Sequence, residues 1–292
     1  MKNGAKTLSL IKPYLFVAPA LIFIGVFTVY PVFHTLYSGF LRWGVLSPEP
    51  VFIGLENYRE AIASPVFWRV WGNTLTYSLC TVVGTVILGL ILALLANNER
   101  IKGQAFFRTS LFYPHMLPWA VAAMVWMWMF QPRRGLINNL FGLEIDWLRS
   151  AKYALPALII AAIWKGTGFN FLLFLSGLQS IPKEFYEAAK LETNSWWHQF
   201  RYITLPMLSP TTFVVVLLAI IGSFQSVDLV YIMTQGGPAN HTNVIIHYIY
   251  QQGIASWRLG YGSALSFMLF AVLLVLTIIY LVLMEKRVEY ER

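Results

Sequence analysis

The chain has 292 residues, of which 58% are hydrophobic and only 12% are charged, and its formal net charge is +8. A soluble globular domain has about twice that charged fraction, so the composition excludes a soluble protein and predicts a membrane protein. In so apolar a chain the basic excess indicates loops that face the cytoplasm and anionic lipid, and it does not indicate nucleic-acid binding.

Six segments are apolar and long enough to cross a hydrocarbon core about 30 Å thick, which takes about 20 helical residues. In chain order, we predict these spans at about residues 13–36, 72–96, 106–130, 154–177, 207–233 and 262–284. The first is too long for the apolar core of a signal peptide, so we expect an uncleaved anchor. Pro114 and Pro118 interrupt the third span. Because proline removes a backbone donor, we expect a kink there.

The distribution of lysine and arginine predicts the orientation of these spans. If the N-terminus is cytoplasmic, the inner segments carry twelve of these residues and the outer loops carry eight. Cytoplasmic loops are normally the richer in basic residues, so we expect both termini on the cytoplasmic side. The sequence contains no internal repeat and no linker, which predicts a single transmembrane domain over residues 1–292.

The longest inner segment, residues 178–205, has the pattern of two short helices. Ser180 can cap a first helix over about 182–192, whose alanines give one face a small, flat surface. After a turn at 193–195, a second amphipathic helix begins at Trp196. Two interpretations are open on these grounds: a hairpin on the inner membrane surface that only connects two spans, or a rigid element that docks into a groove of a soluble partner.

The spacing of residues in this segment is specific. Glu187-Ala188-Ala189 is followed by three residues, Thr193, nine residues, and then Ile203-Thr204-Leu205-Pro206. This spacing resembles at every element the EAA loop of binding-protein-dependent ABC importer permeases, which has glycine at the Thr193 position and usually aspartate at the Glu192 position. In that family the loop is a coupling helix pair that inserts into a cleft on the ATPase subunit. The resemblance implies a set of ATPase-coupling residues: Glu187, Ala188, Ala189, Glu192 and Thr193.

A longer resemblance covers residues 223–266, which are similar to the end of the fifth span and the next outer loop of permeases for oligosaccharides and glycerol phosphate. Residues 14–23 and 113–130 are similar to the first and third spans of the same subfamily. The resemblance implies the type I ABC importer permease fold. That fold is an all-α membrane protein with six transmembrane helices and a cytoplasmic coupling helix pair.

The same resemblance implies the partners and the location. The partners would be a second permease subunit in a heterodimer, an ABC ATPase dimer that binds ATP and Mg²⁺, and an extracytoplasmic solute-binding protein that docks at Gly236, Gly237 and Pro238. This chain would bind no cofactor and catalyse no reaction, since it lacks a P-loop and its five histidines are too scattered for a metal site. The expected location is the cytoplasmic (inner) membrane of a bacterium or an archaeon, in which the chain would be a multi-pass protein.

Polar and aromatic side chains within the fourth and fifth spans are candidates for the substrate pathway, because an ionisable group in hydrocarbon must face a cavity or a partner. The candidates are Trp164, Lys165 and Asn170 in the fourth span and Gln225, Asp228 and Tyr231 in the fifth. These groups could hydrogen-bond a sugar or offer it a stacking face. Alternatively, Lys165 and Asp228 could pair with each other, or either could snorkel toward an interface.

These observations predict a permease subunit of an ATP-driven importer, which takes up an oligosaccharide, a disaccharide or a related polyol such as glycerol-3-phosphate by alternating access. The main alternative is a secondary carrier driven by an ion gradient through Asp228 and Lys165. The absence of an inverted repeat disfavours this carrier. A membrane-embedded enzyme would need an acid–base or metal set, which the sequence does not show.

Overall fold

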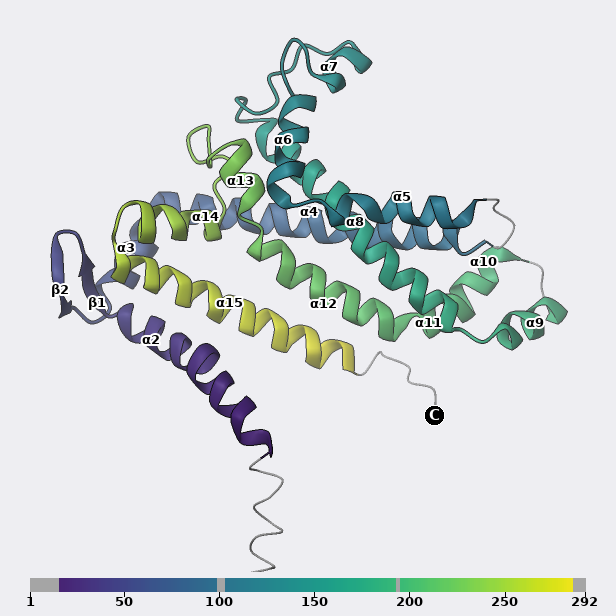
Figure 1. Cartoon of the computed structure of the whole chain (residues 1–292), viewed down its shortest axis with the longest axis horizontal. Coiled ribbons are helices and arrows are strands. Elements are labelled where there is room, and N and C mark those ends of the chain that lie inside the picture. The colour runs from purple at the N-terminus through teal and green to yellow at the C-terminus, as the bar shows by residue number, and fades with distance from the viewer. Residues whose placement is uncertain (1–15, 99–102, 193–194, 286–292) are drawn as a thin grey trace, which may run out of the picture. The chain divides into compact units, whose positions relative to one another are not determined.

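A computed structural model describes residues 16–98, 103–192 and 195–285 (Figure 1). Most of these residues are helical. The helical segments that are long and apolar enough to cross a membrane number five within the described ranges: Phe16–Ser38, Pro65–Ala96, Ala154–Ser180, Ser209–Met233 and Leu259–Met284. The chain divides into two compact units, of which the first comprises residues 1–64 and 249–271 and the second comprises residues 65–248 and 272–292.

The first unit contains a helical segment with a π-helical turn at Gly25–Val29, which continues as α2 (Tyr30–Ser38). β1 (Leu41–Gly44) and β2 (Ser47–Phe52) then form an antiparallel hairpin. The sequence analysis did not predict these strands, because the two prolines of β2 lack the backbone donors of a normal strand. The hairpin accommodates them because β2 pairs with one strand only.

The hairpin is held by side chains and backbone of the same unit. Asn57 of α3 (Glu56–Ala63) is buried, and its amide donates hydrogen bonds to the carbonyl oxygens of Gly39 at 2.9 Å and Leu41 at 3.0 Å. Gly44 lies directly against the carbonyl oxygen of Trp257, where any Cβ atom would collide. Trp257 follows a second π-helical turn, at 250–255, and precedes α15 (Leu259–Glu285).

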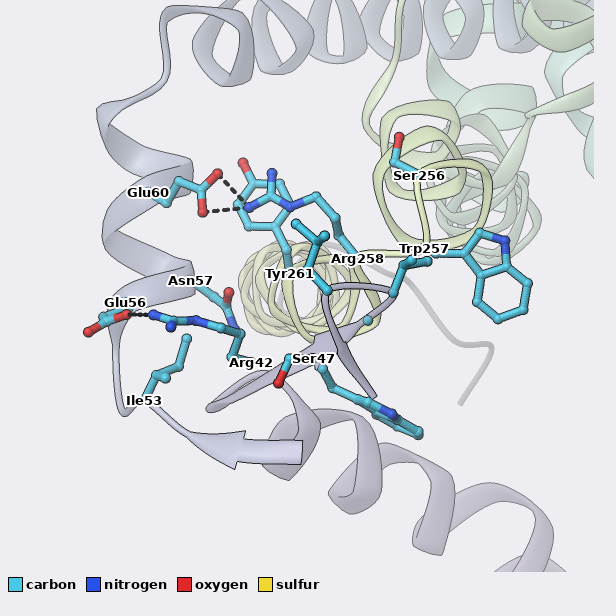
Figure 2. Close-up of a pocket in the computed structure, with 14 residues that line it drawn as sticks. Arg42, Ser47, Ile53, Glu56, Asn57, Glu60, Ser256, Trp257, Arg258 and Tyr261 are labelled. Carbon is cyan, nitrogen blue, oxygen red and sulfur yellow. Dashed lines mark hydrogen bonds and ion pairs between the residues drawn. The ribbon is translucent and has the colours of Figure 1, made fainter. Parts of the chain in front are cut away.

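Two ion pairs border a cleft of about 360 Å³ in this unit (Figure 2). Arg42 lies 2.8 Å from Glu56, and Arg258 lies 2.6 Å from Glu60. The guanidinium group of Arg258 also stacks 4.3 Å from the ring centre of Tyr261. Figure 2 shows these contacts joining α3 to β1 and to the start of α15.

The second unit is built on two long helices, α4 (Pro65–Ala96) and α8 (Ala154–Ser180), which lie side by side (Figure 1). Small residues permit this close approach. A Cβ atom at Gly89 would lie 2.9 Å from the Cβ atom of Asn170, and α8 buries alanines along its first half. α5 (Gln104–Met116) packs on α8, and α12 (Ser209–Gln225) packs on both α4 and α8.

The third predicted span, 106–130, is two helices rather than one. α5 ends at Met116, Leu117 is extended with φ −66° and ψ 139°, and α6 (Trp119–Met129) begins after Pro118. Pro118 lacks an N–H and disfavours helical geometry in the residue before it, so the helix cannot continue. α6 has 11 residues and is too short to cross a membrane alone. The count of six spans therefore stays a prediction.

The remaining elements of the second unit connect or extend these helices. They are α7 (Leu136–Phe141), α9 (Lys183–Glu192), α10 (Trp196–Gln199), a π-helical turn at Phe200–Thr204, α11 (Leu205–Met207), α13 (Asp228–Met233), α14 (Ile245–Ile249) and the later part of α15. α13 packs on α6 and α8. The later part of α15 is tied to α12 by a hydrogen bond of 3.0 Å from the hydroxyl of Tyr280 to the carbonyl oxygen of Phe213.

Two clusters of buried apolar side chains form the core of the second unit. One includes Trp126, Phe130 and Leu158, near the start of α8, and the other includes Phe171 and Phe174 and extends to the end of α8. Between these clusters, the middle of α4 and the middle of α8 carry polar residues. The unit is therefore apolar at two levels along these helices and polar at the level between them.

The outward faces of the long helices are also apolar. On α4, Leu79, Ile87 and Leu95 are 67%, 52% and 55% exposed. Exposing such side chains to water costs about 25 cal/mol per Å². In contact with hydrocarbon this free-energy cost is absent. This surface is that of a helix surrounded by lipid.

Candidate functional site

A small cavity lies at the polar level between α4, α5, α8 and α12. Its volume is about 130 Å³, which is the share of liquid occupied by about four water molecules. Its polar lining residues are Tyr77, Thr81, Thr85, His115, Asn170, Ser223 and Ser226. Trp119 and Phe169 supply aromatic surface to the same wall.

The break between α5 and α6 borders this cavity and is stabilised by a buried lysine. The ammonium group of Lys165, which is 2% exposed, donates a hydrogen bond of 2.9 Å to the carbonyl oxygen of His115 and another to that of Leu117. It also lies 4.7 Å from the ring centre of Trp119. The break leaves these carbonyls without helical partners, and a cation at the C-terminal end of α5 is favourable.

This arrangement corrects one prediction. Lys165 and Asp228 do not pair: Lys165 bonds to backbone carbonyls of the α5–α6 break, and Asp228 is an exposed residue at the start of α13. A carboxylate is favourable in the first turn of a helix because the N-terminal N–H groups carry partial positive charge. The sequence suggested the pair because these are oppositely charged groups in neighbouring spans. It could not show that a proline break would supply the carbonyl oxygens of His115 and Leu117 to the lysine.

A second helix break borders the cavity between α12 and α13. Ser226 has an extended ψ of 95°, and its hydroxyl oxygen accepts a hydrogen bond of 3.2 Å from the hydroxyl of Tyr77 on α4. Interrupted helices expose backbone polar groups that are tolerated in a membrane only where they line a cavity or are buried in protein. Both interrupted helices thus lie next to one cavity, whose mostly apolar wall carries a few polar side chains.

Two buried polar atoms in the cavity wall make no hydrogen bond to any described residue: the hydroxyl oxygen of Thr81 and Nδ1 of His115. The ring of His115 is fixed by stacking on Phe169, with the ring centres 5.1 Å apart. A buried polar group without a partner costs about 1–3 kcal/mol. A ligand with hydroxyl groups could remove this cost. The sequence analysis missed both residues, since a threonine or a histidine in a span is marked as unpaired only by the packing around it.

The six residues predicted for the substrate pathway lie in different surroundings. Asn170 is buried in the cavity wall. Lys165, also on α8, bonds to the carbonyl oxygens of the α5–α6 break beside this wall. Trp164 is half-buried and packs edge-on against Trp126, with ring centres 5.8 Å apart. The other three are exposed within the second unit: Gln225, Asp228 and Tyr231.

Residues 183–192 and 196–199 form α9 and α10, the two short helices of the predicted helical hairpin, and α9 is largely exposed. α9 exposes Glu187 and Ala188, and Ala189 is half-buried. The hairpin is anchored by Tyr186, whose hydroxyl lies 3.0 Å from that of Thr204 and whose ring packs on the core cluster that contains Phe171. The side chain of Glu192 and the whole of Thr193 lie outside the described residues.

The caps of this hairpin differ in part from the prediction. Ser180 does not cap α9, because it is the last residue of α8 and its hydroxyl donates to the carbonyl oxygen of Gly177 at 2.8 Å. Ser195 caps α10 and accepts from the backbone N–H of His198 at 3.4 Å. A serine at the end of a helix can turn back to a carbonyl as readily as it can cap the next helix.

The loop with Gly236, Gly237 and Pro238 is fixed to the first part of α4. The amide of Asn73 donates to the carbonyl oxygens of Asn240 at 2.7 Å and Asn243 at 3.0 Å. Gly236 has φ +80°, and a Cβ atom there would also crowd the side chain of Asn243. The loop is therefore preformed, with Gly236 buried and Gly237 and Pro238 half-buried.

A buried histidine, His247, supports this loop from α14. Its Nδ1 lies 2.9 Å from the side-chain oxygen of Asn243. Burial lowers the pKa of His247 below its ordinary value of 6.5, so the neutral ring is favoured. Within residues 16–98, 103–192 and 195–285, no group of three His, Cys, Asp or Glu side chains is placed to hold a metal ion.

Comparisons with known proteins agree with this geometry. Residues 85–289 match the family model described as "Binding-protein-dependent transport system inner membrane component". The sulfoquinovosyl glycerol transport system permease protein SmoG of Agrobacterium fabrum is 38% identical over 272 residues, which is 91% of this chain and 88% of that protein. The sn-glycerol-3-phosphate transport system permease protein UgpA of Brucella suis is 32% identical over 284 residues, 96% of this chain and 97% of that one.

A solved structure shares the fold. It is the crystal structure of a bacterial ABC transporter involved in the import of the acidic polysaccharide alginate, with a TM-score of 0.81 and 22% identity, and the match covers 97% of this chain and all of that one. The predicted type I ABC importer permease fold is thereby confirmed. The chain belongs to the family of binding-protein-dependent transport system inner membrane components, the permease subunits of ABC importers.

Proposed function

We propose that this multi-pass inner-membrane subunit imports a carbohydrate or a related polyol, such as an oligosaccharide, a disaccharide or glycerol-3-phosphate. The relatives named for sulfoquinovosyl glycerol and for sn-glycerol-3-phosphate support this class, because both solutes carry several hydroxyl groups. The observation that carries the proposal is the cavity between α4 and α8, whose wall contains Asn170 together with Thr81 and His115, each with a polar atom that is buried and unpaired among the described residues. Hydroxyl groups of a polyol both donate and accept, so one ligand can satisfy all three.

The cavity is much smaller than a disaccharide, so the solute requires an open state of the pathway. At about 130 Å³ the open-sided cavity would hold only part of such a solute. Opening it would separate the interrupted helices on either side. A second permease subunit in a heterodimer would supply the other half of the pathway, and alternating opening to each side would move the solute.

The energy would come from a partner. α9 would act as the ATPase-coupling element, with Glu187 and Ala188 on its exposed face, Ala189 half-buried and Glu192 as its last residue. Thr193, the next residue in the sequence, completes the proposed coupling set. An ABC ATPase dimer that binds ATP and Mg²⁺ would close around this hairpin. Tyr186 would transmit the movement to the core, since its hydroxyl bonds to Thr204 and its ring packs on the core.

The same scheme assigns the two sides of the membrane. Both termini and α9 would face the cytoplasm, as the distribution of basic residues predicts. An extracytoplasmic solute-binding protein would dock at Gly236, Gly237 and Pro238, where the loop is held rigid by Asn73. The ion-driven alternative loses its support, because Lys165 is engaged by carbonyls and family membership indicates a subunit coupled to an ATPase.

The coupling hairpin gives the most direct test. Glu187→Lys and Ala188→Asp change exposed positions of α9, so the folded spans should persist while transport and binding of the ATPase decrease. Lys152→Gln changes an exposed residue in the loop before α8 and serves as the control. We expect both α9 variants to co-purify with less ATPase and to lose hydrolysis stimulated by the loaded binding protein. Normal ATPase yield together with normal transport in both variants would refute the assignment.

A further inference from the structure

A basic cleft lies where the ends of three helices of the second unit meet one side of a fourth. It is bordered by the end of α4, the start of α5, the end of α8 and one side of α9, and its volume is about 690 Å³. Its lining includes Asn97, Gln104, Arg108, Gln179, Lys183 and Lys190. The cavity described above lies half-way along α4 and α8, so this basic cleft is a separate site.

The floor of the basic cleft is built around the last turn of α4. The amide of Gln104 donates to the carbonyl oxygen of Ala96 at 2.8 Å, and the guanidinium group of Arg108 donates to the same oxygen at 3.3 Å. When the side-chain amide of Gln179 is turned so that its oxygen faces Arg108, this oxygen accepts a hydrogen bond of 3.1 Å from the guanidinium group. Nε of Arg108 is buried and has no partner among the described residues. The guanidinium group is thus held in place by Ala96 and Gln179.

The charge of the basic cleft is predominantly positive. Arg108, Lys183 and Lys190 line it, and among the described residues of its lining Glu187 alone is acidic. Asn97 and Gln104 add amide groups that can donate hydrogen bonds. Fixed guanidinium groups and flexible ammonium groups around polar amides are the usual surroundings of a bound phosphate group.

The basic cleft lies next to the ends of two predicted spans. α4 ends at Ala96 and α8 ends at Ser180, and their 32 and 27 residues exceed the about 20 that cross the hydrocarbon, so we place the cleft at the headgroup level or just beyond it. On the proposed topology this side faces the cytoplasm, where anionic lipids attract basic residues near the membrane surface. A phosphate group could therefore come from an anionic phospholipid or from a soluble phosphate compound.

We propose that the basic cleft binds a phosphate group, and that the bound group fixes α9 against the ends of α4 and α8. Lys183 and Lys190 lie at the two ends of α9, whereas Arg108 belongs to α5. A phosphate that contacts both helices would restrict movement of the proposed coupling element. The site goes beyond the proposed transport function, because it would be occupied whatever the solute is.

The test measures lipid retention by the assembled importer. The complex is purified in detergent that contains equal amounts of phosphatidylglycerol and phosphatidylcholine, and the bound lipids are counted by native mass spectrometry. The variant is Lys183→Gln with Lys190→Gln. The control is Arg201→Gln, an exposed cation of the π-helical turn that does not line the cleft. We expect one retained phosphatidylglycerol, weakened about fivefold for each lysine removed and about 25-fold in the double variant.

A second measurement distinguishes the source of the phosphate. Inorganic phosphate is titrated into the lipid-depleted complex, and its binding is read as a rise in Tm. A rise that the double variant loses, without selective lipid retention, supports a soluble phosphate ligand. Retention of phosphatidylglycerol that inorganic phosphate does not displace supports a lipid headgroup.

Two results would overturn the proposal. One is equal lipid retention and equal phosphate response in wild type and double variant. The other is unchanged retention together with loss of the ATPase, which would assign the lysines to a protein contact. Single Lys190→Gln is included so that a folding defect in the double variant does not decide the matter. Because neither measurement depends on transport, failure here is distinguishable from failure of the proposed function.

Discussion

The ammonium group of Lys165 on α8 donates a hydrogen bond of 2.9 Å to the carbonyl oxygen of His115 at the end of α5. A proline-induced break thus provides backbone acceptors, and a cation from the neighbouring helix satisfies them. The break turns α6 away from α5, and the lysine makes that turn stable in an apolar environment. The charge is accounted for by structure, so its burial does not imply ion transport.

Replacing Lys165 with methionine should destabilise the protein strongly. The change leaves the carbonyls of His115 and Leu117 buried without a partner, at about 1–3 kcal/mol each. For a chain of this size, each kcal/mol lowers Tm by about 2–4 °C. The measurement is Tm of the purified importer in detergent. Lys152→Met, at an exposed position, should change stability by less than about 0.5 kcal/mol. A Lys165→Met protein that melts with the wild type would contradict the structure of the break.

Gly168 should tolerate no side chain, because it is the point of closest approach between α8 and α5. A Cβ atom there would lie 2.9 Å from the carbonyl oxygen of Leu111 and 3.3 Å from the Cβ atom of His115. We expect Gly168→Ala to cost about 1–3 kcal/mol by forcing the helices apart. Gly72→Ala is the matched control, since Gly72 lies in α4 with open space around it. It should stabilise by about 0.5–1 kcal/mol, and similar Tm shifts for both variants would count against the packing.

Thr81→Val should separate transport from stability. Because the Thr81 hydroxyl has no protein partner, its loss should leave Tm unchanged or raise it. If the hydroxyl binds the solute, uptake should fall by roughly 5- to 10-fold, which corresponds to about 1 kcal/mol. Thr74→Val is the contrasting variant: its hydroxyl accepts from the N–H of Ile245 at 2.8 Å, so Tm should fall. Wild-type uptake by Thr81→Val would remove this residue from the pathway.

The class of the protein could be predicted from composition, and much of its helical plan could be predicted from the apolar runs. The predicted span 154–177 falls on α8 (Ala154–Ser180), because a continuous apolar run with few prolines leaves only one regular solution in lipid. The third span could not be predicted in detail. The sequence indicates a kink at Pro118, but whether the helix bends or breaks depends on what satisfies the freed carbonyls.

The candidate site was predictable only in part, for a related reason. Asn170 could be found because an amide in an apolar run is rare and needs a polar partner. Thr81 could not, because a threonine normally bonds to the carbonyl four residues earlier, as Thr74 does to Val70 at 2.7 Å. That Thr81 lacks such a bond is a property of the packing. The β1–β2 hairpin was missed because β2 contains two prolines and because one contact that holds the hairpin, from the N–H of Val45 to the carbonyl oxygen of Trp257, comes from about 200 positions later.

The ion pair between Arg258 and Glu60 should contribute little to stability by itself. Both side chains are about half exposed, and exposed pairs contribute about 0–1 kcal/mol. A double-mutant cycle with Arg258→Gln and Glu60→Gln isolates the pair from the stacking of Arg258 on Tyr261. We expect a coupling energy below about 1 kcal/mol that decreases in high salt. A salt-independent coupling of several kcal/mol would show that the pair is shielded from solvent.

Stability should fall as the pH falls below 7, because of His247. Burial lowers the pKa of this histidine in the folded state below 6.5, so between the two pKa values the unfolded chain binds more protons than the folded one. The contribution of His247 is therefore complete above about pH 6.5 and is lost as the pH falls through 6.5 toward the lowered value. One proton gives at most about 1.4 kcal/mol per pH unit. The measurement is Tm between pH 8 and pH 5 for the wild type and for His247→Gln, which can keep a hydrogen bond to Asn243. The variant should show a shallower pH dependence, and an identical slope in both proteins would mean that other groups cause the acid sensitivity.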